Sequence, residues 1–164
     1  MNLLEVINPL EWIYRLFSSI YGGNLAEFLS GYDCAQDDWV NQNLFIPLGL
    51  VAIGVALLVF VVYYYIVNSA KLNKWWHWAL VMLFVGAINL FIGYEWVSPL
   101  HPQIGDCLRY YVTDEGQLDQ SIEVITNGSF WLFGLANAIV SSLFFILFSV
   151  AFKWWSSNCR RTPF

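Results

Sequence analysis

Long apolar runs separated by short polar segments dominate this chain. Three of them are at least 20 residues long and cover 44–67, 75–94 and 129–154. None contains an acidic residue, and the only basic residue in them is Lys153, near the end of the third run. A helix of about 20 apolar residues crosses the ~30 Å hydrocarbon layer of a bilayer, where the backbone must satisfy its polar groups internally. The pattern predicts three transmembrane helices.

Composition supports lipid as the solvent. Hydrophobic residues make up 59% of the 164 residues and charged residues only 12%, whereas soluble domains average about 25% charged residues. Mean hydropathy is +0.57. The predicted fold class is an all-α integral membrane protein with short amphipathic helices before the first span and a small extracytoplasmic domain.

Charges separate by segment and predict the orientation. The link 68–74, the end of the third run at Lys153 and the residues after it hold five of the seven basic residues and no acidic one. The regions 1–43 and 95–128 hold all twelve carboxylates and only two basic residues. Because basic residues accumulate on the cytoplasmic side, we expect 1–43 and 95–128 outside, and 68–74 and the tail 155–164 inside. This is an N-out/C-in topology.

Tryptophans fall at the same boundaries. Indole rings prefer the headgroup level of a bilayer. In the predicted topology eight of the nine tryptophans mark an interface, the outer one at Trp39, Trp96 and Trp131 and the inner one at Trp75, Trp76, Trp78, Trp154 and Trp155.

Two short helices are expected before the first span. Asn8 with Glu11, and Asn24 with Glu27, place a capping residue three positions ahead of a glutamate, and Gly31 suits the end of the second helix. The first helix is expected to present a broad apolar face made of Leu10, Ile13, Leu16, Phe17 and Ile20. Such a helix lies along the outer membrane surface, packs on the spans, or offers a surface to a partner.

The loop 95–128 is long for a connection, so it is expected to have structure of its own. Its sequence predicts a strand at 107–113, a turn at 114–116, and then a second strand or a short helix.

The outer regions contain two cysteines, Cys34 in the first and Cys107 in the second. In an oxidising compartment two such thiols pair, which predicts a Cys34–Cys107 disulfide. Cys159 falls on the reducing side and is expected to be a free thiol.

Small and polar residues line one face of each span. In the second span these are Gly86, Asn89 and Gly93, and in the third Gly134, Asn137, Ala138, Ser141 and Ser142. In lipid, helices associate through close backbone approach and interhelical hydrogen bonds. Asn89 and Asn137 both lie about 10 Å inside the outer interface, which predicts a hydrogen bond between them. In the alternative they line a pore made by several subunits, with Glu95 at its mouth.

No pattern of catalytic, cofactor-binding or metal-binding residues is present in the sequence. His77 and His101 fall on opposite sides of the membrane, there is no glycine-rich phosphate loop, and no carboxylates pair within a span. A metal site at His101, Asp106 and Cys107 fails if Cys107 is oxidised. We therefore expect no enzyme activity and no cofactor.

The expected function is that of a non-enzymatic subunit of a larger membrane assembly, formed with copies of itself or with other membrane subunits. Its acidic outer domain would make the partner contacts, and no nucleic-acid binding is expected. The alternative is an oligomeric channel or a membrane-permeabilising pore. The three-span topology with a basic tail is similar to that of class I phage holins, from which the structured loop and the disulfide depart. No organellar presequence is visible, so we expect the bacterial inner membrane.

Overall fold

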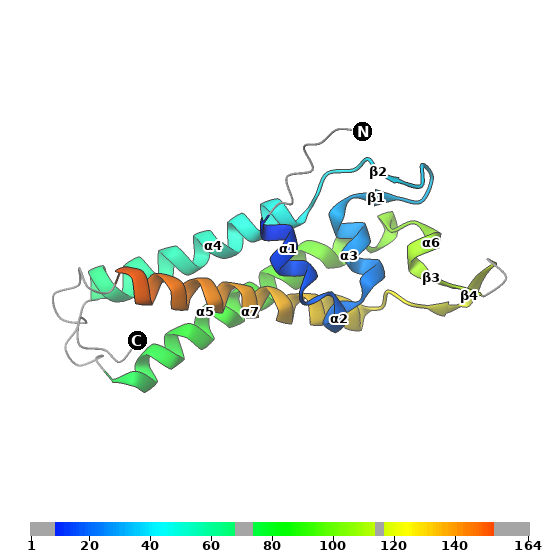
Figure 1. The fold of residues 1–164 in the computed structure, drawn as a ribbon. Coiled ribbons are helices and arrows are strands. Elements are labelled where there is room, and N and C mark those ends of the chain that lie inside the picture. Colours follow the sequence, from blue (N-terminus) through cyan, green and yellow to red (C-terminus); the bar gives the residue numbers. More distant parts are fainter. Residues whose placement is uncertain (1–8, 68–73, 114–116, 153–164) are drawn as a thin grey trace.

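Three long helices form the body of the protein (Figure 1). The computed structural model describes residues 9–67, 74–113 and 117–152. The long helices are α4 (Phe45–Val61), which continues as the π-helix η1 (Val62–Val67), α5 (Trp75–Val97) and α7 (Asn127–Phe152). Each is long and apolar enough to cross a membrane, which confirms the prediction of three such helices.

The helix ends differ from those suggested by hydropathy. The second apolar run ends at residue 94, yet α5 continues to Val97 and then into the 3-10 helix η3 (Ser98–Gln103). Hydropathy detects where side chains become polar, whereas a helix ends where its backbone hydrogen bonds end. The exposed residues Glu95 and Trp96 do not interrupt the backbone hydrogen bonds of α5. The predicted tail 155–164 and most of the link 68–74 lie outside the described residues.

Three short helices precede α4: α1 (Pro9–Arg15), α2 (Ser18–Tyr21) and α3 (Gly23–Ser30). The predicted cap Asn8 lies outside the described residues. The predicted cap Asn24 is wrong, because Asn24 lies inside α3 and its amide donates to the carbonyl oxygen of Leu108 at 2.9 Å. Gly31 ends α3 with φ of 99°, a left-handed conformation that glycine adopts without strain.

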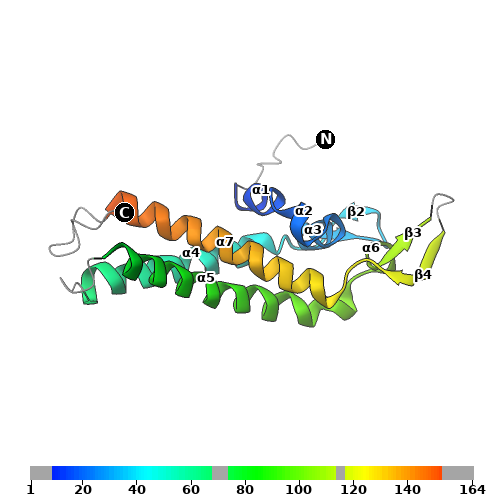
Figure 2. The ribbon, with the colours of Figure 1, turned by 90° about the horizontal axis from the view of Figure 1, so that it is seen from below.

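The short helices pack on the long ones. Tyr14 and Tyr21 are fully buried, and their rings contact the ring of Phe133 on α7 at centroid distances of 5.9 and 5.2 Å. The expected apolar face of α1 was therefore only partly right, since Leu16 and Ile20 are exposed and the tyrosines face the core. Figure 2 shows α1 beside the middle of α7.

The fold is not purely helical. Two antiparallel ribbons lie near the same end of the bundle, β1 (Tyr32–Asp33) with β2 (Asp38–Trp39), and β3 (Tyr110–Val112) with β4 (Leu118–Glu123). The strand expected at 107–113 is shorter than predicted, because the helix α6 (Asp106–Arg109) occupies its first half. Asp106 in the first turn and Arg109 in the last suit the helix dipole.

A disulfide joins Cys34 to Cys107 with their Cα atoms 6.0 Å apart, which confirms the predicted pairing. It connects the β1–β2 ribbon to α6. A Cβ atom added to Gly105 would lie 2.5 Å from the sulfur of Cys34, so only glycine fits beside the bond. We refer to this end of the bundle as the disulfide end.

Thiol counting tests the disulfide. Because the chain has three cysteines, denatured protein treated with a maleimide-polyethylene glycol should carry one adduct before reduction and three afterwards. A Cys159→Ser control should carry none and two. Three adducts before reduction would contradict the pairing. In the chain-entropy model, closing a loop with a sequence separation of 73 stabilises by about 4 kcal/mol, an upper limit here because the packed helices already restrain the loop.

Candidate functional site

The closest helix contact lies between α5 and α7, where glycines allow the backbones to approach. A Cβ atom added to Gly134 would lie 2.6 Å from the carbonyl oxygen of Leu90, and one added to Gly93 would lie 3.1 Å from both Asn137 Cβ and Gly134 Cα. Farther along, a Cβ atom added to Gly86 would lie 3.2 Å from Ser142 Oγ and 3.8 Å from the carbonyl oxygen of Ala138. These six predicted residues (Gly86, Gly93, Gly134, Asn137, Ala138, Ser142) therefore meet at one interface.

Asn137 connects three elements. Its side-chain amide donates to the backbone oxygen of Asn89 on α5 at 2.7 Å, and its side-chain oxygen accepts from the hydroxyl of Tyr14 on α1 at 2.5 Å. Asn137 is fully buried. Burial also raises the pKa of Tyr14, with a smaller contribution from Tyr21, so the Tyr14 hydroxyl stays protonated and able to donate.

Asn89 contributes its backbone, not its side chain, to this contact. Its amide donates to the carbonyl oxygen of Val85 in its own helix at 3.1 Å. Its side-chain oxygen is buried and has no hydrogen-bond partner among the described residues. Ser141 likewise bonds within its own helix, to the carbonyl oxygen of Ala138 at 3.0 Å.

The buried asparagines bear on the pore alternative. Asn89 and Asn137 are both 0% exposed within a single chain, so neither side chain lies on a surface that could line a channel between subunits. Glu95 is exposed near the end of α5. The arrangement favours helix packing for the asparagines.

Tyr14 is the member of this cluster that the sequence reasoning missed. Tyr14 and Tyr21 are seven residues apart, a spacing that would place them on one face of a continuous helix, although in the structure a turn separates α1 from α2. That spacing was the available signal, but the surrounding leucines and isoleucines suggested a different face.

An ion pair holds the base of the β3–β4 ribbon. Arg109 Nε lies 2.7 Å from Glu123 Oε1, and His101 Nε2 lies 3.0 Å from the same oxygen. The hydrogen bond from Arg109 holds the pKa of Glu123 below its usual value, and the same bond raises the pKa of Arg109. The pair therefore persists above the usual glutamate pKa and is lost as pH falls through the lowered value.

The β3–β4 ribbon exposes a set of apolar side chains. We call this set the ribbon surface: Tyr111, Val112, Leu118, Ile122 and Val124, each between 40% and 50% exposed. It includes both faces of the ribbon, because the neighbouring residues Tyr111 and Val112 point to opposite sides of β3. A cleft of about 540 Å³ separates the ribbon from α3, and its lining includes Glu27, Tyr32 and Tyr110. In both views the ribbon continues along the bundle axis, away from the long helices (Figures 1 and 2).

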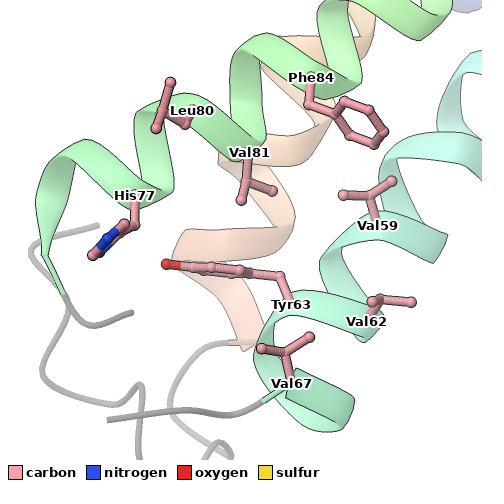
Figure 3. Close-up of a pocket in the computed structure, with 8 residues that line it drawn as sticks. All are labelled: Val59, Val62, Tyr63, Val67, His77, Leu80, Val81 and Phe84. Carbon is pink, nitrogen blue, oxygen red and sulfur yellow. The ribbon is translucent and has the colours of Figure 1, made fainter. Parts of the chain in front are cut away.

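A groove lies at the opposite end, between η1 and α5 (Figure 3). It has a volume of about 340 Å³ and is lined by Val59, Val62, Tyr63, Val67, His77, Leu80, Val81 and Phe84. Figure 3 shows the ring of Tyr63 extending toward His77. The Nδ1 atom of His77 is buried and has no hydrogen-bond partner among the described residues. The apolar walls suit an acyl chain or a side chain, and no sequence motif marked the groove.

Comparison of the chain with family models, curated proteins and solved structures gives no match. Within the described part of the chain, no group of three or more histidine, cysteine, aspartate or glutamate side chains is placed to hold a metal ion. What is established is a mostly helical protein with three helices able to cross a membrane and a disulfide near one end.

The different bonding of the two asparagines predicts different costs of truncation. Asn137→Ala should lower the free energy of unfolding by about 1–3 kcal/mol, because it leaves the Tyr14 hydroxyl and the Asn89 carbonyl unpaired. Asn89→Ala removes equal volume from a buried site but only a bond within its own helix, so it should cost less than about 1 kcal/mol. Reversible unfolding in mixed micelles measures both. Equal costs would contradict the assignment, as would a Tyr14→Phe effect that persists undiminished in the Asn137→Ala background.

The α5–α7 contact predicts opposite outcomes for two glycine substitutions. Gly134→Ala should destabilise by about 1–3 kcal/mol, because the new methyl group meets the Leu90 backbone and the helices must separate. Gly54→Ala is the matched control, since nothing lies within 4 Å of an added Cβ there. It should be neutral or stabilise by up to about 1 kcal/mol. The same unfolding assay distinguishes them, and similar effects at both positions would rule out the close contact.

Proposed function

We propose that this protein is a non-enzymatic integral membrane subunit of a larger assembly, and that its disulfide end docks a protein partner. Two features support an orientation with that end outside. The disulfide requires an oxidising compartment, and the basic residues that follow α4 and α7 in the sequence match the cytoplasmic side. The bacterial inner membrane remains our expected location.

The ribbon surface is the observation that carries the proposal. Large apolar side chains exposed together in water mark contact sites. Lipid does not cover them in this orientation, because the ribbon continues along the bundle axis beyond the ends of the long helices (Figure 2). We therefore propose that the surface of a partner protein shields these apolar side chains from water.

The form of the ribbon suggests how a partner binds. An isolated two-stranded ribbon is marginally stable in water, and the unpaired edge of a strand accepts another strand through main-chain hydrogen bonds. Glu27 lines the cleft beside the ribbon, and Asp119 and Glu123 belong to β4 itself. We therefore expect an extended segment with apolar side chains and a basic rim, whose association slows as salt increases.

The channel hypothesis is the weaker of the two. It needs polar residues facing neighbouring subunits within the membrane, and the two intramembrane asparagines instead face the interior of one chain. An assembly role requires only an exposed docking surface.

Site-specific photo-crosslinking tests the docking surface. With benzoylphenylalanine in place of Ile122, illumination of native membranes should give a discrete adduct heavier than the monomer. Replacement of Gln36, which is exposed in the turn between β1 and β2, should give none. Twice the monomer mass would identify a second copy, and any other mass a different subunit. The absence of an adduct at position 122, together with only monomer in native mass spectrometry, would contradict the proposal.

A further inference from the structure

The depth of α1 along the bundle is fixed by its contact with α7. Tyr14 bonds to Asn137, which lies six residues beyond Trp131. At 1.5 Å per residue that is about 9 Å along the helix from Trp131, whose position marks the predicted outer interface. Tyr14 is the sixth of the seven residues of α1, so this contact places the C-terminal end of α1 well below the start of α7.

A second contact, with a different helix, gives a similar depth. Leu10 packs on Gly49 of α4, where an added Cβ would lie 3.1 Å from both Leu10 methyl carbons. Gly49 is four residues beyond Phe45, the first residue of α4, or about 6 Å along the helix. Both contacts place α1 alongside the outer halves of the long helices, as Figures 1 and 2 show.

The side of α1 and α2 that faces away from the bundle is apolar. Trp12, Leu16 and Ile20 are 56%, 57% and 37% exposed. Trp12 lies in α1, Leu16 in the turn that follows it and Ile20 in α2, and we call these three exposed side chains the stripe. A stripe of this kind would be costly in water and is favourable against acyl chains.

The charged groups of α1 are bonded within the protein. Arg15 lies 2.8 Å from Glu11 and donates to Ser30 Oγ at 3.1 Å. Glu11 also accepts from the Asn43 amide at 2.5 Å. Ser30 ends α3 and Asn43 precedes α4, so both partners lie toward the outer end of the bundle. The charged groups of Arg15 and Glu11 therefore point toward the interface, as the ends of long charged side chains do at membranes.

We infer that α1 and α2 are inserted into the outer leaflet of the membrane, where the stripe of Trp12, Leu16 and Ile20 contacts lipid acyl chains. Of the two, α2 lies nearer the interface, because its Tyr21 contacts Phe133, two residues beyond Trp131. The helices neither lie on the membrane surface nor cross it. The inference rests on the membrane placement in the proposed function and adds a lipid contact to it.

Nitroxide accessibility tests the insertion. In a Cys159→Ser background, Leu16→Cys, Leu135→Cys and Gln36→Cys are each spin-labelled and placed in phosphatidylcholine and phosphatidylglycerol vesicles. Leu135 is exposed on α7, close to the depth of Asn137, and serves as the lipid standard, while Gln36 serves as the water standard. Leu16 should match Leu135, with high collision rates for oxygen and rates for a water-soluble nickel chelate several-fold below those of Gln36.

The two proposals fail in different ways. If Leu16 matches Gln36 while Leu135 remains shielded, α1 is not inserted although the long helix is. If Leu135 is also open to the nickel chelate, the membrane placement fails and the inference with it. An Ile20→Cys label in the same stripe gives an independent reading, and both exposed positions lie outside the packed core, so folding should be preserved.

Discussion

The hydrogen bonds of Asn137 organise the half of the molecule near the disulfide. A side-chain amide in an apolar interior is most stable when both its nitrogen and its oxygen are paired, as they are in Asn137. Here the nitrogen pairs with the α5 backbone and the oxygen with the hydroxyl of Tyr14. The bond with Tyr14 connects the three-helix bundle to α1 and holds α1 against it. The position of the N-terminal helices therefore follows from a polar requirement inside the bundle, with aromatic packing around it.

The two ends of the bundle differ in construction as a result. At the disulfide end, the short helices, Phe45 and Phe133 form one continuous core. The two cysteines of the disulfide pack against this core. At the opposite end, α4 gives way to a π-helix and an open groove lies between η1 and α5. Trp78 bonds to Ser149 there at 3.2 Å and keeps α5 against α7. Of the two buried clusters in the described residues, the larger lies at the end that carries the ribbon surface.

Sequence alone predicted the features that have a one-dimensional signature. Apolar runs predicted the three long helices, and separation of charges placed both disulfide cysteines in one compartment. Small residues such as Gly93 and Gly134 identified the faces that meet. The role of Tyr14 could not be predicted, because in lipid a helix is apolar on its buried and exposed sides alike. Asn24 was misassigned for a related reason, since its partner Leu108 is distant in sequence and only the folded outer domain brings them together.

The inserted helices and the ribbon surface are mechanically one unit if both proposals hold. Asn24 joins α3 to α6, the disulfide joins α6 to the β1–β2 ribbon, and α6 leads directly into β3. A partner that binds the ribbon therefore acts on a body whose other side is embedded in lipid through α1 and α2. Such a body resists tilting, because rotation of the ribbon would move the apolar stripe of α1 toward water. This constraint would fix the orientation of the docking surface relative to the membrane without any contact by the partner itself.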